Sequence, residues 1–132
     1  MYRLIHLIVK TFINAEKGLG KRIFHIVSQL TPLICVELIV KIYKSNNVVL
    51  VYRDDEFYGP GWHLPGGIVR YKELVKNRIY ATLKKELSLF AEDITKISYI
   101  NNFEVIDNEK MVRAHFISLL HIIELSSEKS YL

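Results

Sequence analysis

The stretch that decides the fold is GWHLPGGIVRYKE, residues 61–73. Its paired glycines, Gly66 and Gly67, lie between a short extended piece and an expected helix. Glycines at such a junction let the backbone approach a ligand closely, and the N-terminus of a following helix favours anions. The stretch alone predicts a tight turn that is suited to phosphate, although most glycine pairs are only turns.

The residues after the glycines predict an amphipathic helix over about 72–87. Its apolar residues recur at every fourth position, which places them on one buried face. They are Val75, Ile79, Leu83 and Leu87. The opposite face is left for solvent or for chemistry.

The rest of the chain predicts an α+β (α/β) fold. Helices are expected over residues 2–16 and 21–30, because Gly18-Leu19-Gly20 interrupts the first helix and Thr31-Pro32 ends the second. Segments rich in β-branched residues predict two hairpins. Their strands are 34–42 with 48–53, and 94–106 with 111–125. Together these elements predict a mixed sheet with helical cover.

The composition predicts one folded domain. The 132 residues are 50% hydrophobic and 24% charged, which is a globular composition. A net charge of +4 fits an anionic small ligand as well as it fits nucleic acid, so charge does not choose between them. The single cysteine, Cys35, excludes an intramolecular disulfide and favours a reduced, cytoplasmic setting.

The first residues, MYRLIHLIVKTFINA, are apolar enough to raise the question of a membrane. Their longest uncharged run is about half of the roughly 20 residues that a spanning helix needs, and no small-residue cleavage site follows. The preferred interpretation is a helix that packs on the domain, and the alternative is a peripheral membrane contact. We therefore expect residues 1–20 to form an N-terminal helical extension of a domain over 21–132.

In this context the opening stretch resembles the start of a Nudix box. The pattern of that family is Gly, five residues, Glu, seven residues, then Arg-Glu-apolar-x-Glu-Glu-x-Gly. Gly67 and Glu73 are in register, and Glu86 holds the last acidic position. The positions of the arginine, two acids and the final glycine are held by Ala81, Thr82, Lys85 and Ser88. A box with one acid left should not hold the several Mg²⁺ ions of ordinary Nudix pyrophosphohydrolases.

The chain also resembles one Nudix branch that tolerates such losses, the GDP-mannose mannosyl hydrolases, over residues 21–125. In that branch a helix leads into Thr-Pro-Leu, a strand that contains an acid, a hairpin that ends in arginine, and Trp-x-x-Pro-Gly-Gly. The matching features here are Thr31-Pro32-Leu33, Glu37, Arg53 and residues 62–67.

This resemblance implies a Nudix-type α/β/α sandwich that hydrolyses a nucleotide sugar such as GDP-mannose. Water would attack the sugar C1 and release the nucleoside diphosphate with the help of one Mg²⁺, or Mn²⁺ in its place. The resemblance assigns the metal to the Gly67 carbonyl and Glu86. It assigns the diphosphate to Arg53, whose guanidinium suits phosphate, and a substrate contact to Glu37. Gly66 and Glu73 would have structural roles, Glu73 by favouring the helix N-terminus.

Departures from the branch leave the catalytic residues unassigned. The arginine after the second glycine is replaced by Ile68. The glutamine that completes the metal shell and the histidine that acts as base have no counterpart after Leu125, so the usual last helix is also expected to be missing. His63 is the only histidine near the expected metal, and it matches a position that is not catalytic in the branch. His115 and His121 are interpreted as strand histidines.

Two other functions stay open. The chain could be a Nudix pyrophosphohydrolase that cleaves the diphosphate of a nucleoside-diphosphate compound, or a catalytically impaired domain that only binds nucleotide sugars. We expect no nucleic-acid partner. A homodimer is expected, because a sheet face without its last helix would expose apolar surface. The base and sugar preference cannot be read from the residues.

Overall fold

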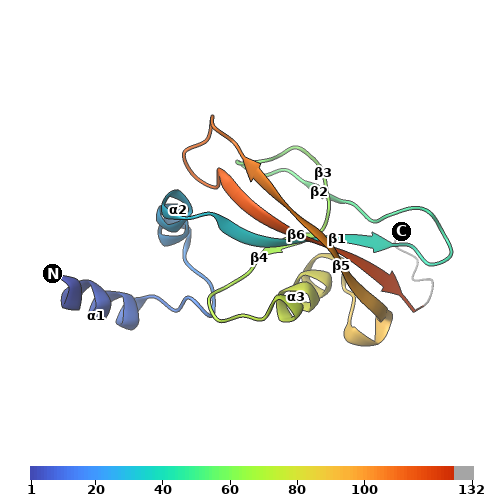
Figure 1. Ribbon diagram of the computed structural model, residues 1–132, viewed down its shortest axis with the longest axis horizontal. Helices are drawn as coiled ribbons and strands as arrows, with labels where there is room; N and C mark the ends of the chain where they lie inside the picture. The colour runs from blue at the N-terminus through green and yellow to red at the C-terminus, as the bar shows by residue number, and fades with distance from the viewer. Residues whose placement is uncertain (127–132) are drawn as a thin grey trace.

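The computed structural model describes residues 1–126 of the chain (Figure 1). The helices are α1 (Tyr2–Phe12), α2 (Lys21–Leu30), α3 (Val75–Leu87) and the short 3₁₀ helix η1 (Ala91–Asp93). The strands are β1 (Leu33–Lys41), β2 (Val51–Arg53), β3 (Gly61–His63), β4 (Gly66–Ile68), β5 (Ile94–Ile106) and β6 (His115–Leu125). Both α2 and β5 have the predicted bounds.

A four-stranded mixed sheet in the order β4-β1-β6-β5 is the centre of the molecule. Strand β1 runs parallel to β6 and antiparallel to β4, and β5 runs antiparallel to β6. The α+β class with a mixed sheet is therefore confirmed. The second predicted hairpin is also confirmed, but β6 begins at His115 because residues 107–114 form a longer loop.

Side chains of β1 point alternately to the two faces of the sheet, and only one of these faces carries the core. Val36, Leu38 and Val40 are fully buried and pack with Ile79 and Leu83 of α3. Because successive side chains of a strand point to opposite faces, Cys35 and Glu37 lie on the other face of the sheet. The apolar stripe predicted for α3 is confirmed, since its central residues reach the core and Val75 and Leu87 pack at the edge.

The first predicted hairpin forms only in part. One bridge pairs Lys41 with Val48, and the chain then leaves the sheet. Strand β2 pairs with β3 in a separate two-stranded sheet. The reason is competition for the edge of β1: residues 65–69 bond to residues 34–38, which leaves only the end of β1 for residues 47–49.

The prediction that the first helix packs on the domain is wrong. Helix α1 ends at Phe12 rather than at residue 16, and it has no buried residue. Within residues 1–126 no helix is long and apolar enough to span a membrane. The expectation that the usual last helix is missing falls on residues outside those that the structure describes, and the division at residue 20 stays a prediction.

Helix α3 ends at Leu87, and Ser88, the residue that caps it, stands where the Nudix box has its final glycine. Ser88 has φ of 52° and ψ of 33°, the left-handed conformation that favours glycine at a helix end. Its N–H donates to the carbonyls of Leu83 and Lys84, and the Leu89 N–H also donates to Leu83. The backbone therefore keeps the turn that glycine would make, with a side chain that disfavours it.

Ser88→Gly is expected to raise the free energy of unfolding by about 0.5–1 kcal/mol, because it relieves the left-handed conformation. Lys84→Gly, in the exposed interior of the same helix, should lower it by about 1 kcal/mol. Urea unfolding of the two variants measures both changes. A loss of stability in Ser88→Gly would contradict the argument.

Candidate functional site

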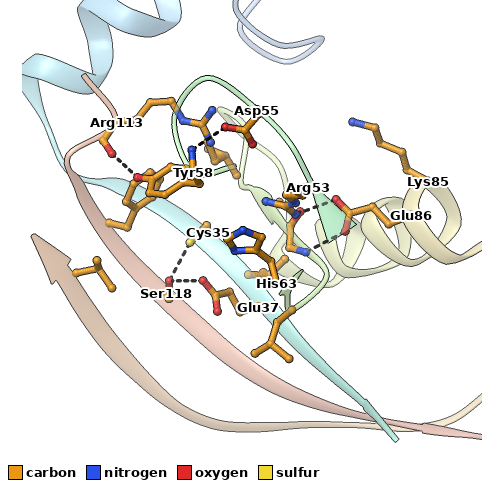
Figure 2. A pocket seen from close by; sticks show the side chains of 17 residues that line it. Cys35, Glu37, Arg53, Asp55, Tyr58, His63, Lys85, Glu86, Arg113 and Ser118 are labelled. Atoms are coloured by element: carbon orange, nitrogen blue, oxygen red, sulfur yellow. Dashed lines mark hydrogen bonds and ion pairs between the residues drawn. The ribbon is translucent and has the colours of Figure 1, made fainter. Parts of the chain in front are cut away.

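A pocket of about 410 Å³ opens on the face of the sheet that carries Glu37 (Figure 2). Its walls come from all six strands, the C-terminal turn of α3, and the loops before β3 and β6. Five of the six residues selected from the sequence line it. They are Glu37, Arg53, Gly66, Gly67 and Glu86. The sixth, Glu73, lies outside the pocket.

The two glycines of the opening stretch are required by packing. A Cβ on Gly66 would lie 2.9 Å from the Val36 carbonyl oxygen, and a Cβ on Gly67 would lie 2.7 Å from Oγ1 of Thr82. Contacts this short exclude a side chain unless the β1 backbone near Gly66, or Thr82 near Gly67, moves. The glycines therefore allow strand β4 to approach both β1 and α3 closely. This is a different reason from the phosphate approach that the sequence suggested.

Arg53 and Glu86 form an ion pair on the pocket wall. Nη2 of Arg53 lies 3.1 Å from Oε1 of Glu86 and 3.4 Å from the Gly66 carbonyl oxygen. The Gly66 N–H donates to Oε2 of Glu86 at 3.3 Å. Both side chains are mostly buried. The residue assigned to the metal and the residue assigned to the diphosphate thus neutralise each other, and Lys85 lines the pocket beside them.

A second polar group lies on the floor of the pocket. The Ser118 hydroxyl donates to Oε1 of Glu37 at 3.3 Å and lies 3.0 Å from Sγ of Cys35. Burial raises the pKa of Glu37, against the opposing effects of Ser118, Arg53 and His63. Burial also raises the pKa of the Cys35 thiol, which disfavours a nucleophilic thiolate.

His63 of β3 also lines the pocket, where Figure 2 shows its ring between Glu37 and Arg53. Its Nε2 is buried and has no hydrogen-bond partner among the described residues. The other two histidines singled out from the sequence lie in β6 and outside this pocket: His115 pairs with Glu104 at 2.7 Å, and His121 contacts the Leu119 carbonyl.

An aromatic wall closes the pocket on the side of the loop between β2 and β3. The Tyr58 hydroxyl donates to the Arg113 carbonyl at 2.6 Å. The Arg113 guanidinium lies against the rings of Phe57 and Tyr58, 4.8 and 5.4 Å from their centroids, and against Phe24 of α2. N–H groups of Phe57 and Tyr58 donate to Asp55, and these bonds, the Phe57 bond first, lower the pKa of that carboxyl.

Sequence reasoning missed most of this wall and the floor. None of the aromatic residues of the loop was singled out from the sequence. Arg113 and Ser118 gave no signal, because their approach to the pocket depends on the pairing of β6 with β1 and on the 107–114 loop. Arg113 and Tyr58 line the pocket and can contact a nucleobase, and Arg53 and Lys85 can contact phosphate.

Glu73 has a structural role beside the pocket. Its carboxylate accepts two hydrogen bonds of 2.8 Å from Nε and Nη2 of Arg78, and one of 2.9 Å from the Arg70 N–H. Burial acts to raise the pKa of Glu73, but the hydrogen bonds from Arg78 and Arg70 outweigh it and the pKa is lowered. The partner of this carboxylate is therefore Arg78, which lies three residues before Ala81, the residue at the arginine position of the box.

Comparison with solved structures identifies the fold. A NUDIX hydrolase from Nitrosomonas europaea matches with a TM-score of 0.61 and 9% identity, over 76% of this chain and 64% of its own. The NUDIX domain of Shewanella oneidensis NrtR, solved with ADP ribose, matches with 0.59 and 14% identity over 93% and 71%. A MutT/nudix family protein from Enterococcus faecalis matches with 0.59 and 18% identity over 75% and 40%.

This chain has the Nudix fold. It spans 64% of the length of the Nitrosomonas europaea hydrolase. No protein-family model matches the sequence, and no curated protein sequence matches it significantly.

Glu73→Gln is expected to lower the free energy of unfolding at pH 7 by about 1–2 kcal/mol, because the buried Arg78 guanidinium loses its charged partner. The folded pKa of Glu73 is lowered, so its contribution is present above the unfolded pKa and is lost as the pH falls through the folded pKa. Urea unfolding should therefore show the difference from the parent chain shrinking with acidification.

Glu92→Gln is the control for this comparison, because Glu92 is exposed. It should change stability by less than about 0.5 kcal/mol at neutral pH. If both variants behave alike, the Glu73–Arg78 pair does not hold the loop to α3.

Proposed function

We propose that this chain is a Nudix-type hydrolase of a nucleoside-diphosphate sugar, with GDP-mannose as the first substrate to assay. Water attacks the sugar C1, the bond from C1 to the bridging oxygen breaks, and the nucleoside diphosphate leaves with the bonding electrons. The observation that supports this proposal is the meeting of Arg53, Glu86 and Glu37 in one pocket with an aromatic wall.

The charges of the pocket favour attack at carbon over attack at phosphorus. Cleavage within a diphosphate brings water to an anionic phosphorus, and Nudix pyrophosphohydrolases do this with several Mg²⁺ ions. Within residues 1–126 no three His, Cys, Asp or Glu side chains are grouped as metal ligands. Attack at C1 instead requires that charge on the departing diphosphate be neutralised, and the cations Arg53 and Lys85 are placed to do so.

Glu37 is the group that we assign as proton acceptor. It lines the pocket, and its raised pKa brings it nearer to the pH at which a base is most effective. Ser118 holds its carboxylate, so one oxygen is oriented and the other is left for water. His63 stands beside it as a cation when protonated, which favours the ionised form of Glu37.

A divalent ion fits the pocket in one way. Glu86 and the Gly67 carbonyl are the residues assigned to it, and both oxygens of Glu86 are engaged, one by Arg53 and one by the Gly66 N–H. Glu86 can take Mg²⁺ or Mn²⁺ when Arg53 turns to a diphosphate. When bound, the ion would supply positive charge to the leaving diphosphate. Occupation of the metal site and of the phosphate site should therefore favour each other.

The second candidate is a domain that binds nucleotide sugars without turnover. It is favoured by the closed Arg53–Glu86 pair and by Lys85 at an acidic position of the box. The NUDIX domain of Shewanella oneidensis NrtR has been solved with ADP ribose, a nucleoside-diphosphate sugar. The cytoplasmic setting and the homodimer remain predictions from the sequence, and no nucleic-acid partner is proposed.

Product analysis tests the reaction. Incubation with GDP-mannose and Mg²⁺ in ¹⁸O-labelled water should release mannose and GDP, with the label in the sugar. Release of sugar phosphate and GMP, with the label in a phosphate, would assign the alternative cleavage of the diphosphate. Tight binding of GDP-mannose without either product would assign the binding domain.

Glu37→Gln should lower the rate by about 100-fold or more, because it removes the base. A base acts when deprotonated, so the rate of the parent chain should rise with pH through a pKa above the ordinary value of about 4.3. The variant should lose this acid limb. An unchanged pH profile in Glu37→Gln would remove Glu37 from the mechanism.

Binding of Mn²⁺ without nucleotide tests whether Glu86 exchanges Arg53 for a divalent ion. Arg53→Gln frees an oxygen of Glu86 and is expected to tighten Mn²⁺ binding by about tenfold, whereas Glu86→Gln should abolish it. Arg70→Gln removes the same charge from an exposed position outside the pocket and is the matched control. Electron paramagnetic resonance of free Mn²⁺ measures all three. Equal affinities in Arg53→Gln and Arg70→Gln would contradict the exchange.

A further inference from the structure

Helix α1 projects from the domain without covering it (Figure 1). None of its 11 residues is buried, and its apolar side chains are exposed by 45% for Val9 to 81% for Phe12. Exposed apolar surface on a contiguous patch is unusual in a soluble protein and marks an interaction site. The helix therefore presents an apolar surface that the described part of the chain does not cover.

The side chains of α1 divide into two arcs. With 100° between successive residues, the apolar arc covers nearly half of the helix circumference. It consists of Tyr2, Leu4, Ile5, Ile8, Val9 and Phe12. The opposite arc carries Arg3, His6 and Lys10 and contains no acidic residue. This combination of a broad apolar face with a basic polar face is typical of helices that lie in a membrane interface.

The net positive charge of the protein is concentrated at this end. Residues 1–22 contain five Lys or Arg and one Glu, which gives +4 and equals the net charge of the whole chain. The remaining 110 residues therefore carry 13 basic and 13 acidic side chains. An anionic surface would attract the N-terminal segment and not the domain as a whole.

We propose that α1 lies in the surface of an anionic phospholipid membrane, with its apolar arc among the acyl chains and its basic arc among the headgroups. No described helix is long enough to cross a membrane, so the contact is peripheral. The proposal concerns a surface outside the pocket and is independent of the proposed hydrolase function.

A second copy of the chain fits this surface less well. Eleven residues make about three turns, which is shorter than the three or four heptads of a stable coiled coil. Helix α2, by contrast, is attached to the domain by Lys21–Glu56 at 2.6 Å and by His25 against Phe57. Membrane-bound α1 would therefore tether the folded domain.

Vesicle co-sedimentation of the full chain tests the proposal. The protein should bind vesicles in which about a third of the lipid is phosphatidylglycerol, and bind pure phosphatidylcholine far more weakly. Ile8→Gln should weaken binding about tenfold, because it removes apolar area from within the apolar arc. Arg3→Gln and Lys10→Gln should each weaken it roughly fivefold, and added salt should weaken it further.

Leu7→Gln is the matched control, because Leu7 is even more exposed than Ile8, 59% against 46%, but lies on the basic side of α1. It should bind as the parent chain does, and urea unfolding of the domain should be the same in all variants. Equal losses in Ile8→Gln and Leu7→Gln, or equal binding to both kinds of vesicle, would overturn the proposal. A dimer by light scattering that Ile8→Gln converts to a monomer would assign the surface to a second copy and would also overturn it.

Discussion

The close approach of β4 to both β1 and α3 is the constraint on which the site depends. A Cβ on Gly66 would meet the backbone of β1, and a Cβ on Gly67 would meet Thr82 of α3. With β4 close to both elements, the last turn of α3 reaches the pocket edge, and the Gly66 N–H donates to Glu86. Because β4 pairs with the edge of β1, β2 pairs with β3 instead, and Arg53 of β2 lies beside Glu86. One tight contact thus places both charged groups.

The pocket combines a reduced set of box carboxylates with an equal number of cations and carboxylates on its lining. Arg53, Lys85 and Arg113 line it, against Glu37, Asp55 and Glu86. In a site that held several divalent ions, protein cations beside the box would oppose them. In the proposed reaction these cations would substitute for part of that charge. The loss of box carboxylates is therefore physically consistent with the attack at carbon that we propose.

Sequence reasoning succeeded where the signal is local. Helix α2 and strand β5 have the predicted bounds because Gly20, Pro32 and the β-branched run mark them within a few residues. The pairing of β2 with β3 could not be foreseen, since it depends on competition for the edge of β1. The sequence predicted a helix at α1, but it could not decide whether the apolar face of that helix packs on the domain. The meeting of Glu37, Arg53 and Glu86 came from the family resemblance, whereas Arg113 and Ser118 left no pattern to read.

The ion pair between Glu73 and Arg78 shows that a contact can form although the residues no longer have the spacing of the motif. Position 78 precedes position 81 by three residues, close to one helical turn, so both positions lie on nearly the same face of α3. An arginine moved by one turn can reach the same carboxylate with its long side chain. A pattern written with fixed intervals scores this as a substitution to alanine. A motif on a helix is therefore better described by the helix face on which its residues lie than by fixed intervals in the sequence. A chain that matches no fixed pattern can still contain such a contact.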